Sequence, residues 1–210
     1  MINLIDFDGT IVDVWSRYHA VFCAASGCSE HLLSRSMYRG FRLSGKTDID
    51  IIKTINIVCN VNEFRRRKHS MLENPEMLSK DSLIICKERL LGWFARDDCY
   101  ILTVRRNASA LFQQMSELGI GLLRPRTVII NPDSGTTKEQ WAKQLPRRSD
   151  EILAIGDSCS DMEIGRLDNA RAVHVQTGLF SWNYVHKQCP WAYQITSLQD
   201  YVDGLQLVGL

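Results

Sequence analysis

Short runs of apolar residues recur along this chain, and longer segments with apolar residues at helical spacing lie between them. Such short runs, bounded by polar or turn residues, are typical of buried strands. Five runs are clear and a sixth is weaker. They are Ile2–Ile5, Tyr100–Leu102, Thr127–Ile130, Ile152–Ile155 and Ala172–Val175, with Tyr193–Ile195 as the weaker one.

Helical patterns alternate with these runs in the second half of the chain. Asn107–Leu118 has apolar residues on one face and is followed by Gly119, a typical residue just after a helix end. Thr137–Leu145 and Asp161–Leu167 are shorter helical segments. Alternation of strands and helices predicts an α/β fold with a mostly parallel sheet.

One block interrupts the alternation, because no convincing strand is found between Val14 and Trp93. Four helices are expected there instead: Val14–Ser26, His31–Phe41, Asp48–Cys59 (with Ile51, Ile52, Ile55 and Val58 at helical spacing) and Asn62–Leu72. We therefore predict a helical domain of residues 14–93, inserted into a core formed by residues 1–13 and 94–210. It should cover the carboxyl ends of the strands, where open α/β sheets bind ligands.

Composition narrows the class of protein. The 210 residues are 45% hydrophobic and 23% charged, which suits a globular core. A formal net charge of +1 gives no reason to expect a nucleic acid or a membrane surface as partner. Seven cysteines without a C-x-x-C pair indicate a reducing compartment. With no signal peptide or membrane span in the pattern, we expect a soluble, cytoplasmic protein.

The pentad Asp6-Phe7-Asp8-Gly9-Thr10 follows the first predicted strand directly. Side chains two residues apart in an extended segment point the same way, so both carboxylates can face one pocket. Two close carboxylates repel each other unless a cation or a shared proton relieves the repulsion. Taken alone, the pentad is also compatible with a simple acidic turn.

Polar residues follow the other strands as well. Thr103 comes at the end of the second strand, Lys138 opens the helix after the third, and Gly156-Asp157-Ser158-Cys159-Ser160-Asp161 follows the fourth. Parallel strands bring these ends together at one edge of the sheet. Helix N-termini and a lysine suit an anionic phosphate, and carboxylates suit a hard cation such as Mg²⁺.

This set of residues, in this order, resembles the four motifs of haloacid dehalogenase-like hydrolases. The resemblance extends along the whole chain and implies a Rossmann-like parallel sheet flanked by helices, with the helical insertion as the family's first type of cap domain. Dehalogenase members lack an acid at the position of Asp8. Its presence therefore favours phosphate chemistry over cleavage of a carbon–halogen bond.

The resemblance also implies two catalytic roles. Asp6 would be the nucleophile that forms an aspartyl-phosphate. Asp8 would be the general acid that protonates the leaving oxygen, and then the base that activates water. For the first task it must start protonated, and we expect neighbouring carboxylates to raise its pKa.

The remaining motif residues would bind phosphate and metal. Thr103 and Lys138 would contact the phosphoryl oxygens. The implied Mg²⁺ ligands are Asp6, the backbone carbonyl of Asp8, Asp157, and Asp161 either through water or by orienting the others. Ser158 is either a phosphate contact or the N-cap of the helix near Asp161.

Basic residues outside these motifs are candidates for substrate binding. Gly45-Lys46-Thr47-Asp48 resembles the Gly-Arg-Thr-Asp loop of the phosphoglycolate phosphatase-like and β-phosphoglucomutase-like members, which makes Lys46 a candidate, with Thr47 as a compatible helix N-cap. Arg105 and Arg106 either contact an anionic substrate or pair with Asp97 or Asp98.

Other notable side chains have simpler alternatives. The charge run Arg65–Lys68 is most often a solvated helix face. Trp15 and His19 either line the cleft or pack inside the inserted domain.

The function expected from this reading is a Mg²⁺-dependent phosphatase that hydrolyses a small-molecule phosphate monoester. Two alternatives remain open: a phosphomutase of the β-phosphoglucomutase type, and a non-catalytic binding or regulatory protein with the same fold. The sequence names neither the substrate nor the oligomeric state.

Overall fold

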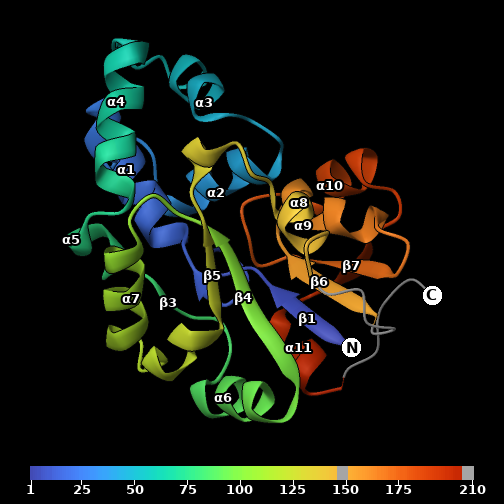
Figure 1. Cartoon of the computed structure of the whole chain (residues 1–210). Helices are drawn as coiled ribbons and strands as arrows, with labels where there is room; N and C mark the ends of the chain where they lie inside the picture. Colours follow the sequence, from blue (N-terminus) through green and yellow to red (C-terminus); the bar gives the residue numbers. More distant parts are fainter. Residues whose placement is uncertain (146–150, 205–210) are drawn as a thin grey trace.

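The computed structural model describes residues 1–145 and 151–204. Its centre is a parallel sheet whose strands lie in the order β5-β4-β1-β6-β7-β8 (Figure 1). The strands are β1 (Ile2–Ile5), β4 (Asp98–Val104), β5 (Thr127–Ile130), β6 (Ile152–Gly156), β7 (Ala170–Val175) and β8 (Tyr193–Ile195). All six strands expected from the apolar runs are therefore confirmed.

Strand β1 lies at the point where the strand order reverses. Its neighbours are β4 on one side and β6 on the other, with Ile5 in register with Ile101 and Ile155. From β4 the chain continues outward to β5, and from β6 outward in the other direction to β7 and β8. Open α/β sheets bind ligands beyond the carboxyl ends of the strands at such a point, and the pentad follows β1 there.

Helices cover both faces of the sheet, since alternate residues of each strand pack to opposite sides. In β1, Leu4 belongs to one buried cluster and Ile5 to another, which continues into the helical insertion. The helices after the insertion are α6 (Lys87–Arg96), α7 (Ala108–Glu117), α8 (Lys138–Ala142), α9 (Cys159–Met162), α10 (Trp182–Gln188) and α11 (Leu198–Val202). Short 3₁₀ segments are η1 (Gly121–Arg126), η2 (Pro132–Ser134) and η3 (Glu163–Arg166).

The insertion itself is helical and lies past the carboxyl end of β4 (Figure 1). It contains α1 (Trp15–Ser26), α2 (Arg35–Leu43), α3 (Asp48–Thr54), α4 (Val61–Leu72) and α5 (Pro75–Leu78). Its interior is built on aromatic contacts: the rings of Tyr38 and Phe64 pack against Phe22 at centroid distances of 5.2 and 5.7 Å. We call these helices the cap.

Two short strands carry the chain into the cap and out of it. Strand β2 (Val12–Asp13) pairs antiparallel with β3 (Ser82–Leu83), with Val12 opposite Leu83. The sequence pattern did not reveal this ribbon, because two residues are too few to display a period.

Helix α3 is shorter than its apolar spacing predicted. It ends at Thr54, and Asn56 has a left-handed φ of 55° that ends the helical path. Ile51 and Ile52 are buried as expected, whereas Val58 is 99% exposed. The fourth apolar position of the pattern thus lies outside the helix.

Helix α6 packs on the core. It contacts β4 and α11, and the ring of Trp93 lies against that of Tyr201 at 5.7 Å. The domain boundary predicted at residue 93 therefore falls inside a helix of the core side, and the ribbon at Ser82–Leu83 marks the return from the cap.

Two further features concern the chain as a whole. No helix within residues 1–145 and 151–204 is long and apolar enough to cross a membrane. All seven cysteines fall in this part of the chain, and each is a free thiol.

Candidate active site

The pentad forms a tight turn anchored by its apolar residue. The backbone N–H of Asp6 donates to the carbonyl of Ile155 at 2.8 Å, which extends the β1–β6 ladder by one bond. Phe7 is fully buried, and its carbonyl accepts from the N–H groups of Ile11 and Val12 at 3.0 Å each. With Phe7 fixed in the core, the carboxylates on either side of it stand at the carboxyl edge of the sheet.

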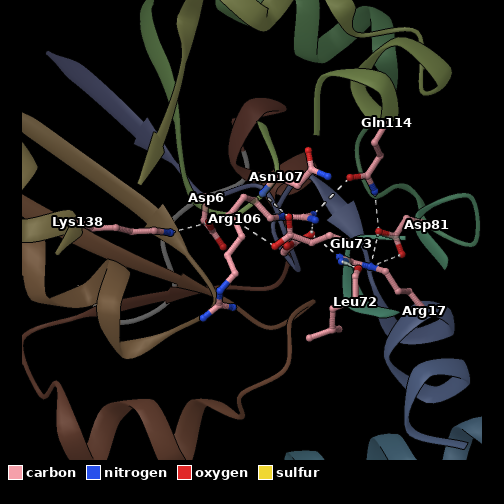
Figure 2. A network of polar contacts seen from close by, with 11 residues as sticks. Asp6, Arg17, Leu72, Glu73, Asp81, Arg106, Asn107, Gln114 and Lys138 are labelled. Atoms are coloured by element: carbon pink, nitrogen blue, oxygen red, sulfur yellow. Dashed lines mark hydrogen bonds and ion pairs between the residues drawn. The ribbon is translucent and has the colours of Figure 1, made fainter. Parts of the chain in front are cut away.

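Lys138 reaches this edge from the start of α8. Thr137 caps the helix through a reciprocal pair of hydrogen bonds with Gln140. This cap fixes the start of α8 at Lys138. The Lys138 ammonium donates to Asp6 Oδ1 and to Asp161 Oδ1, at 2.6 Å in both cases. The lysine expected from the third motif therefore lies between acids of the first and fourth motifs, and it approaches Asp6 from the side opposite Arg17 and Asp81 (Figure 2).

Three buried acids meet beside Lys138. One ligand atom from each of Asp6, Asp157 and Asp161 lies within 4.8 Å of the others. Asp157 Oδ2 accepts the N–H of Leu179 at 2.7 Å. Asp161 Oδ2 accepts both the N–H and the hydroxyl of Ser158, at 3.1 and 2.6 Å, so Ser158 occupies the N-cap of α9, as one of its two readings predicted.

Glycines make room for these acids. A Cβ atom at Gly178 would lie 2.0 Å from Asp157 Cβ, and one at Gly156 would lie 2.2 Å from Asp161 Cγ. Gly9 also faces Asp157, and its φ of 78° is a left-handed conformation that side chains rarely adopt. The acids are thus packed against backbone on several sides.

The charges of this group do not balance among themselves. Burial raises the pKa of Asp6 to about 7, although Lys138 opposes this rise. Burial, together with Asp6 and Asp161, also raises the pKa of Asp157 well above its ordinary value. If all three acids ionise, Lys138 leaves two negative charges without a partner, which is the charge that a divalent cation carries.

Asp8 lies in a different environment. Its Oδ1 accepts from Nη2 of Arg17 and from Nη2 of Arg105, each at 2.6 Å. Burial raises the pKa of Asp8, but the two guanidinium groups outweigh it and the resulting pKa lies below the ordinary value. The expectation of a raised pKa was wrong, because it counted the neighbouring acids and not these two arginines.

The two arginines belong to a closed ring of polar groups, all of them buried except the partly exposed Asp8. Arg17 Nε pairs with Asp81 at 2.9 Å, and Asp81 Oδ2 accepts from Gln114 Nε2 at 2.8 Å. Gln114 Oε1 in turn lies 3.4 Å from Arg105 Nη2, which completes the circuit at Asp8. Figure 2 shows Arg17, Asp81 and Gln114 together on the side of the site away from Lys138.

Sequence reasoning did not find Arg17, Asp81 or Gln114. Arg17 is the only Asp, Glu, Lys or Arg residue in α1, which is the one local signal available. Asp81 lies between Lys80 and Ser82, and Gln114 follows Gln113, so neither differs in polarity from its neighbours in the sequence. Asp81 lies 64 positions from Arg17 and 33 positions from Gln114, so no short spacing reveals that the ring closes through Asp81.

The other predicted residues fall in different places. Thr103 is buried in β4 opposite Ile129, close to the end of the strand. Arg105, buried at 3% exposure, joins Asp8 and not the surface acids. Arg106 pairs with Asp133 on the surface at 3.2 Å.

Cap residues proposed from the sequence make contacts mainly within the cap. The Lys46 ammonium donates to the Thr54 hydroxyl at 2.9 Å and lies over the ring of Phe41. Thr47 is the N-cap of α3, as predicted. His19 bonds the carbonyl of Leu33 at 2.6 Å, which fits packing inside the cap.

Trp15 and the charge run behave differently from each other. The indole of buried Trp15 donates to the carbonyl of Thr177 in the core at 3.0 Å. In the run Arg65–Lys68, Arg66 forms an exposed pair with Glu63, as a solvated face predicts, whereas Lys68 pairs with buried Asp48.

Comparison with known proteins places the fold. No protein-family model matches the chain, and no curated protein matches it by sequence. Solved structures do match it over nearly its full length.

Three of these structures illustrate the likeness. A predicted phosphatase from Clostridium acetobutylicum is 16% identical, with 96% of each chain covered and a TM-score of 0.66. A haloacid dehalogenase-like family hydrolase from Streptococcus pneumoniae is 16% identical, with 98% of each chain covered and a TM-score of 0.62. A chain from Thermotoga maritima named as a β-phosphoglucomutase is 12% identical, with 98% of each chain covered and a TM-score of 0.61. The expected fold, a Rossmann-like core of the haloacid dehalogenase type, is confirmed.

Proposed function

We propose that this protein is a Mg²⁺-dependent phosphatase of the haloacid dehalogenase-like type, which hydrolyses a small-molecule phosphate monoester. The observation that carries the proposal is the buried group of Asp6, Asp157, Asp161 and Lys138 at the carboxyl edge of the sheet beside β1. Phosphoryl transfer requires a positioned nucleophile and positive charge around the phosphate. Asp6 at the end of β1 supplies the first, and Lys138 with a cation held by the acids would supply the second.

The acid cluster supports the metal. The residues that would hold Mg²⁺ are Asp6, the backbone carbonyl of Asp8, and Asp157, with Asp161 as a direct or water-mediated partner. The ion would supply the positive charge that keeps these acids ionised and offsets the charge of the phosphate. The unbalanced charge and the raised pKa values of Asp6 and Asp157 fit that role.

In the first step, Asp6 attacks phosphorus and the bond from phosphorus to the ester oxygen breaks, leaving an aspartyl-phosphate. Lys138 lies 2.6 Å from Asp6, where its ammonium can hold phosphoryl oxygens as negative charge builds up on them. Thr103, at the end of the neighbouring strand, is the proposed second contact. Asp8 gives the leaving oxygen its proton.

In the second step, water attacks the same phosphorus and Asp6 leaves as a carboxylate. Asp8 takes the proton of the attacking water. The low pKa of Asp8 favours this base role, since the residue starts as a carboxylate, and it makes the acid role of the first step the more demanding one.

Two basic residues are proposed substrate contacts. Nε and Nη1 of Arg105 are buried and have no partner among the described residues, and an anionic group of the bound substrate is the partner that we propose for this guanidinium. Lys46 is the weaker case, because its ammonium already bonds Thr54 within the cap.

A phosphomutase is the second candidate, supported by the likeness to the T. maritima chain. It would use Asp6 and Asp8 in the same way but return the phosphoryl group to an isomer of the substrate. Product identity separates the two: an isomerised sugar phosphate without free phosphate indicates the mutase.

The test is a screen for phosphate release over many metabolite phosphates with Mg²⁺, with Asp6→Asn as the matched blank. We expect Asp6→Asn to lose turnover by about 10³-fold or more while remaining folded, because the nucleophile is gone. Asp157→Asn should shift the Mg²⁺ titration to higher concentration. Near-normal activity of Asp6→Asn would contradict the assignment, and a wild-type protein inert toward every ester would favour a non-catalytic binding protein.

A further inference from the structure

Asp8 is anchored through only one of its two carboxylate oxygens. Both arginines donate to Oδ1, while Oδ2 accepts no hydrogen bond from residues 1–145 or 151–204. The side chain of Asp8 is 20% exposed, whereas those of Arg17 and Arg105 are 2% and 3% exposed. Oδ1 is thus held by two guanidinium groups, whereas Oδ2 has no hydrogen-bond partner among the described residues.

Arg17 is itself held from three directions. Its Nε pairs with Asp81, its Nη1 donates to the carbonyl of Leu72 at 3.0 Å, and its Nη2 holds Asp8. A planar guanidinium with three fixed contacts has little freedom to turn. The position of Asp8 Oδ1 is therefore set by groups that lie outside the pentad.

These groups come from both parts of the molecule. Arg17 lies on α1 and Leu72 ends α4, both in the cap, while Asp81 directly precedes the return strand β3. Arg105 and Gln114 belong to the core, after β4 and on α7. One oxygen of Asp8 is consequently bonded to the cap and to the core at once.

We propose that Arg17 is a positioning residue that makes hydrolysis of the phosphoenzyme depend on the position of the cap. This inference rests on the proposed function. With the cap placed as in this structure, Arg17 and Arg105 hold Oδ1 and aim Oδ2 at the attacking water. When α1 moves away, Asp8 loses one anchor and the base is no longer aligned.

The step concerned is the second displacement. The water oxygen forms a bond to phosphorus as a water proton moves to Asp8 Oδ2. The bond between phosphorus and the Asp6 oxygen breaks, and its electron pair returns to the Asp6 carboxylate. The products are inorganic phosphate and the free nucleophile.

Pre-steady-state kinetics with p-nitrophenyl phosphate and Mg²⁺ test the proposal, because this leaving group needs little protonation. For Arg17→Met we expect a burst of p-nitrophenol close to one per protein, followed by a steady-state rate about 10²-fold below the wild type. Acid quenching should then trap more aspartyl-phosphate than in the wild type. A burst and a steady-state rate that fall together, without trapped phosphoenzyme, would overturn the inference.

Two comparisons separate positioning from a general structural effect. Arg17→Met combined with Asp8→Asn should be no slower in the second step than Asp8→Asn alone, because Arg17 acts through Asp8. Arg67→Met is the matched control: this cap arginine donates to the carbonyl of Ala24, away from Asp8, and its loss should leave the ratio of burst to steady-state rate unchanged. Additive effects in the double variant would contradict the proposal.

Further variants keep the test decisive if Arg17→Met does not fold. Arg17→Lys, which keeps the charge, and Asp81→Asn, which loosens the anchor of Arg17, should show the same accumulation to a smaller degree. Crystal structures of wild type and Arg17→Lys give a readout that needs no turnover. An Asp8 carboxylate unchanged in orientation overturns the inference, whereas a wild-type protein that never forms a phosphoenzyme refutes the proposed function instead.

Discussion

Gly178 is the residue at which the packing of the site is tightest. A side chain there would meet Asp157 at 2.0 Å, and Asp157 has little room to move away because Leu179 bonds its Oδ2 and Gly9 lies against it. The acid would have to shift, and with it the geometry of the proposed metal-binding group.

Gly178→Ala should therefore cost roughly 1–3 kcal/mol in the free energy of unfolding through overpacking. It should also raise the Mg²⁺ concentration needed for half-maximal activity by about tenfold, because a ligand is displaced. Gly40→Ala is the control: Gly40 is exposed in α2 with nothing near its Cβ position, and this change should stabilise by about 0.5–1 kcal/mol. Urea unfolding and a metal titration of both variants check the prediction, which fails if Gly178→Ala behaves like Gly40→Ala.

At this scale, the sequence was informative where chemistry follows a strand end. Asp6, Asp157 and Lys138 each stand next to an element boundary that the apolar pattern located, so their meeting at one edge could be predicted. Arg17 and Asp81 have no such marker, since their pairing arises only from how the cap folds back. The direction of the pKa shift of Asp8 depends on its pairing with Arg105 and Arg17, and the sequence revealed neither of these two pairs.

Among the elements, the cap is held by an ion-pair centre at the start of α3. Buried Asp48 accepts from Tyr38 at 3.0 Å and pairs with Arg42 and Lys68 at 3.1 and 2.5 Å. Burial raises the pKa of Asp48, but the two cations and the tyrosine outweigh it, so the pKa lies below the ordinary value. Helices α2, α3 and α4 are joined at this one carboxylate.

Asp48→Asn should destabilise the protein by about 3 kcal/mol at pH 7, because it leaves two cations without their buried partner. Since the folded pKa is lowered, the stabilisation from Asp48 is complete above the ordinary Asp pKa of about 4 and is lost as the pH falls below it. The difference in the free energy of unfolding between the wild type and Asp48→Asn should thus become smaller at acidic pH. Glu63→Gln, which removes only an exposed pair with Arg66, should change the free energy of unfolding far less than Asp48→Asn does. Denaturant unfolding at pH 7 and pH 3.5 measures the stability of both variants. A stability difference between the wild type and Asp48→Asn that does not change with pH would contradict this account.

The elements themselves were predictable in proportion to their length. A strand such as Ile152–Gly156 appears as an uninterrupted apolar run because both of its faces are buried. The ribbon of β2 and β3 is too short to show a pattern, and the end of α3 depends on the left-handed Asn56, which the run of isoleucines conceals. The assignment of α6 to the core depends on its contact with Tyr201, far along the chain.

For the whole molecule, the unbalanced acid group links stability to pH and to metal. Burial raises the pKa of Asp6 to about 7, so the folded protein without metal favours the protonated form. As the pH rises from about 4 through 7, ionising Asp6 costs more in the folded than in the unfolded state, and this group lowers the free energy of unfolding. The proposed Mg²⁺ would bind the ionised acids and compete with their protons.

We therefore expect saturating Mg²⁺ to raise the melting temperature more at pH 8 than at pH 5.5. Thermal denaturation with and without Mg²⁺ at the two pH values measures this. Asp157→Asn, which removes one of the acids, should reduce the effect at pH 8. A stabilisation of equal size at both pH values would show that the acids are not protonated in the metal-free protein.

The β2–β3 ribbon has a consequence for how the chain assembles. Strands β1 and β4 are neighbours in the sheet, with Asn3 opposite Cys99, although the whole cap separates them in sequence. Because the cap enters and leaves at paired residues, Val12 opposite Leu83, a cap that has already folded brings the ends of these two strands close together. The conformational entropy lost in closing the long loop is then lost when the cap folds. Strands β1 and β4 pair afterwards as if a much shorter loop joined them. The insertion that separates the two halves of the core in sequence thus shortens the search by which they meet.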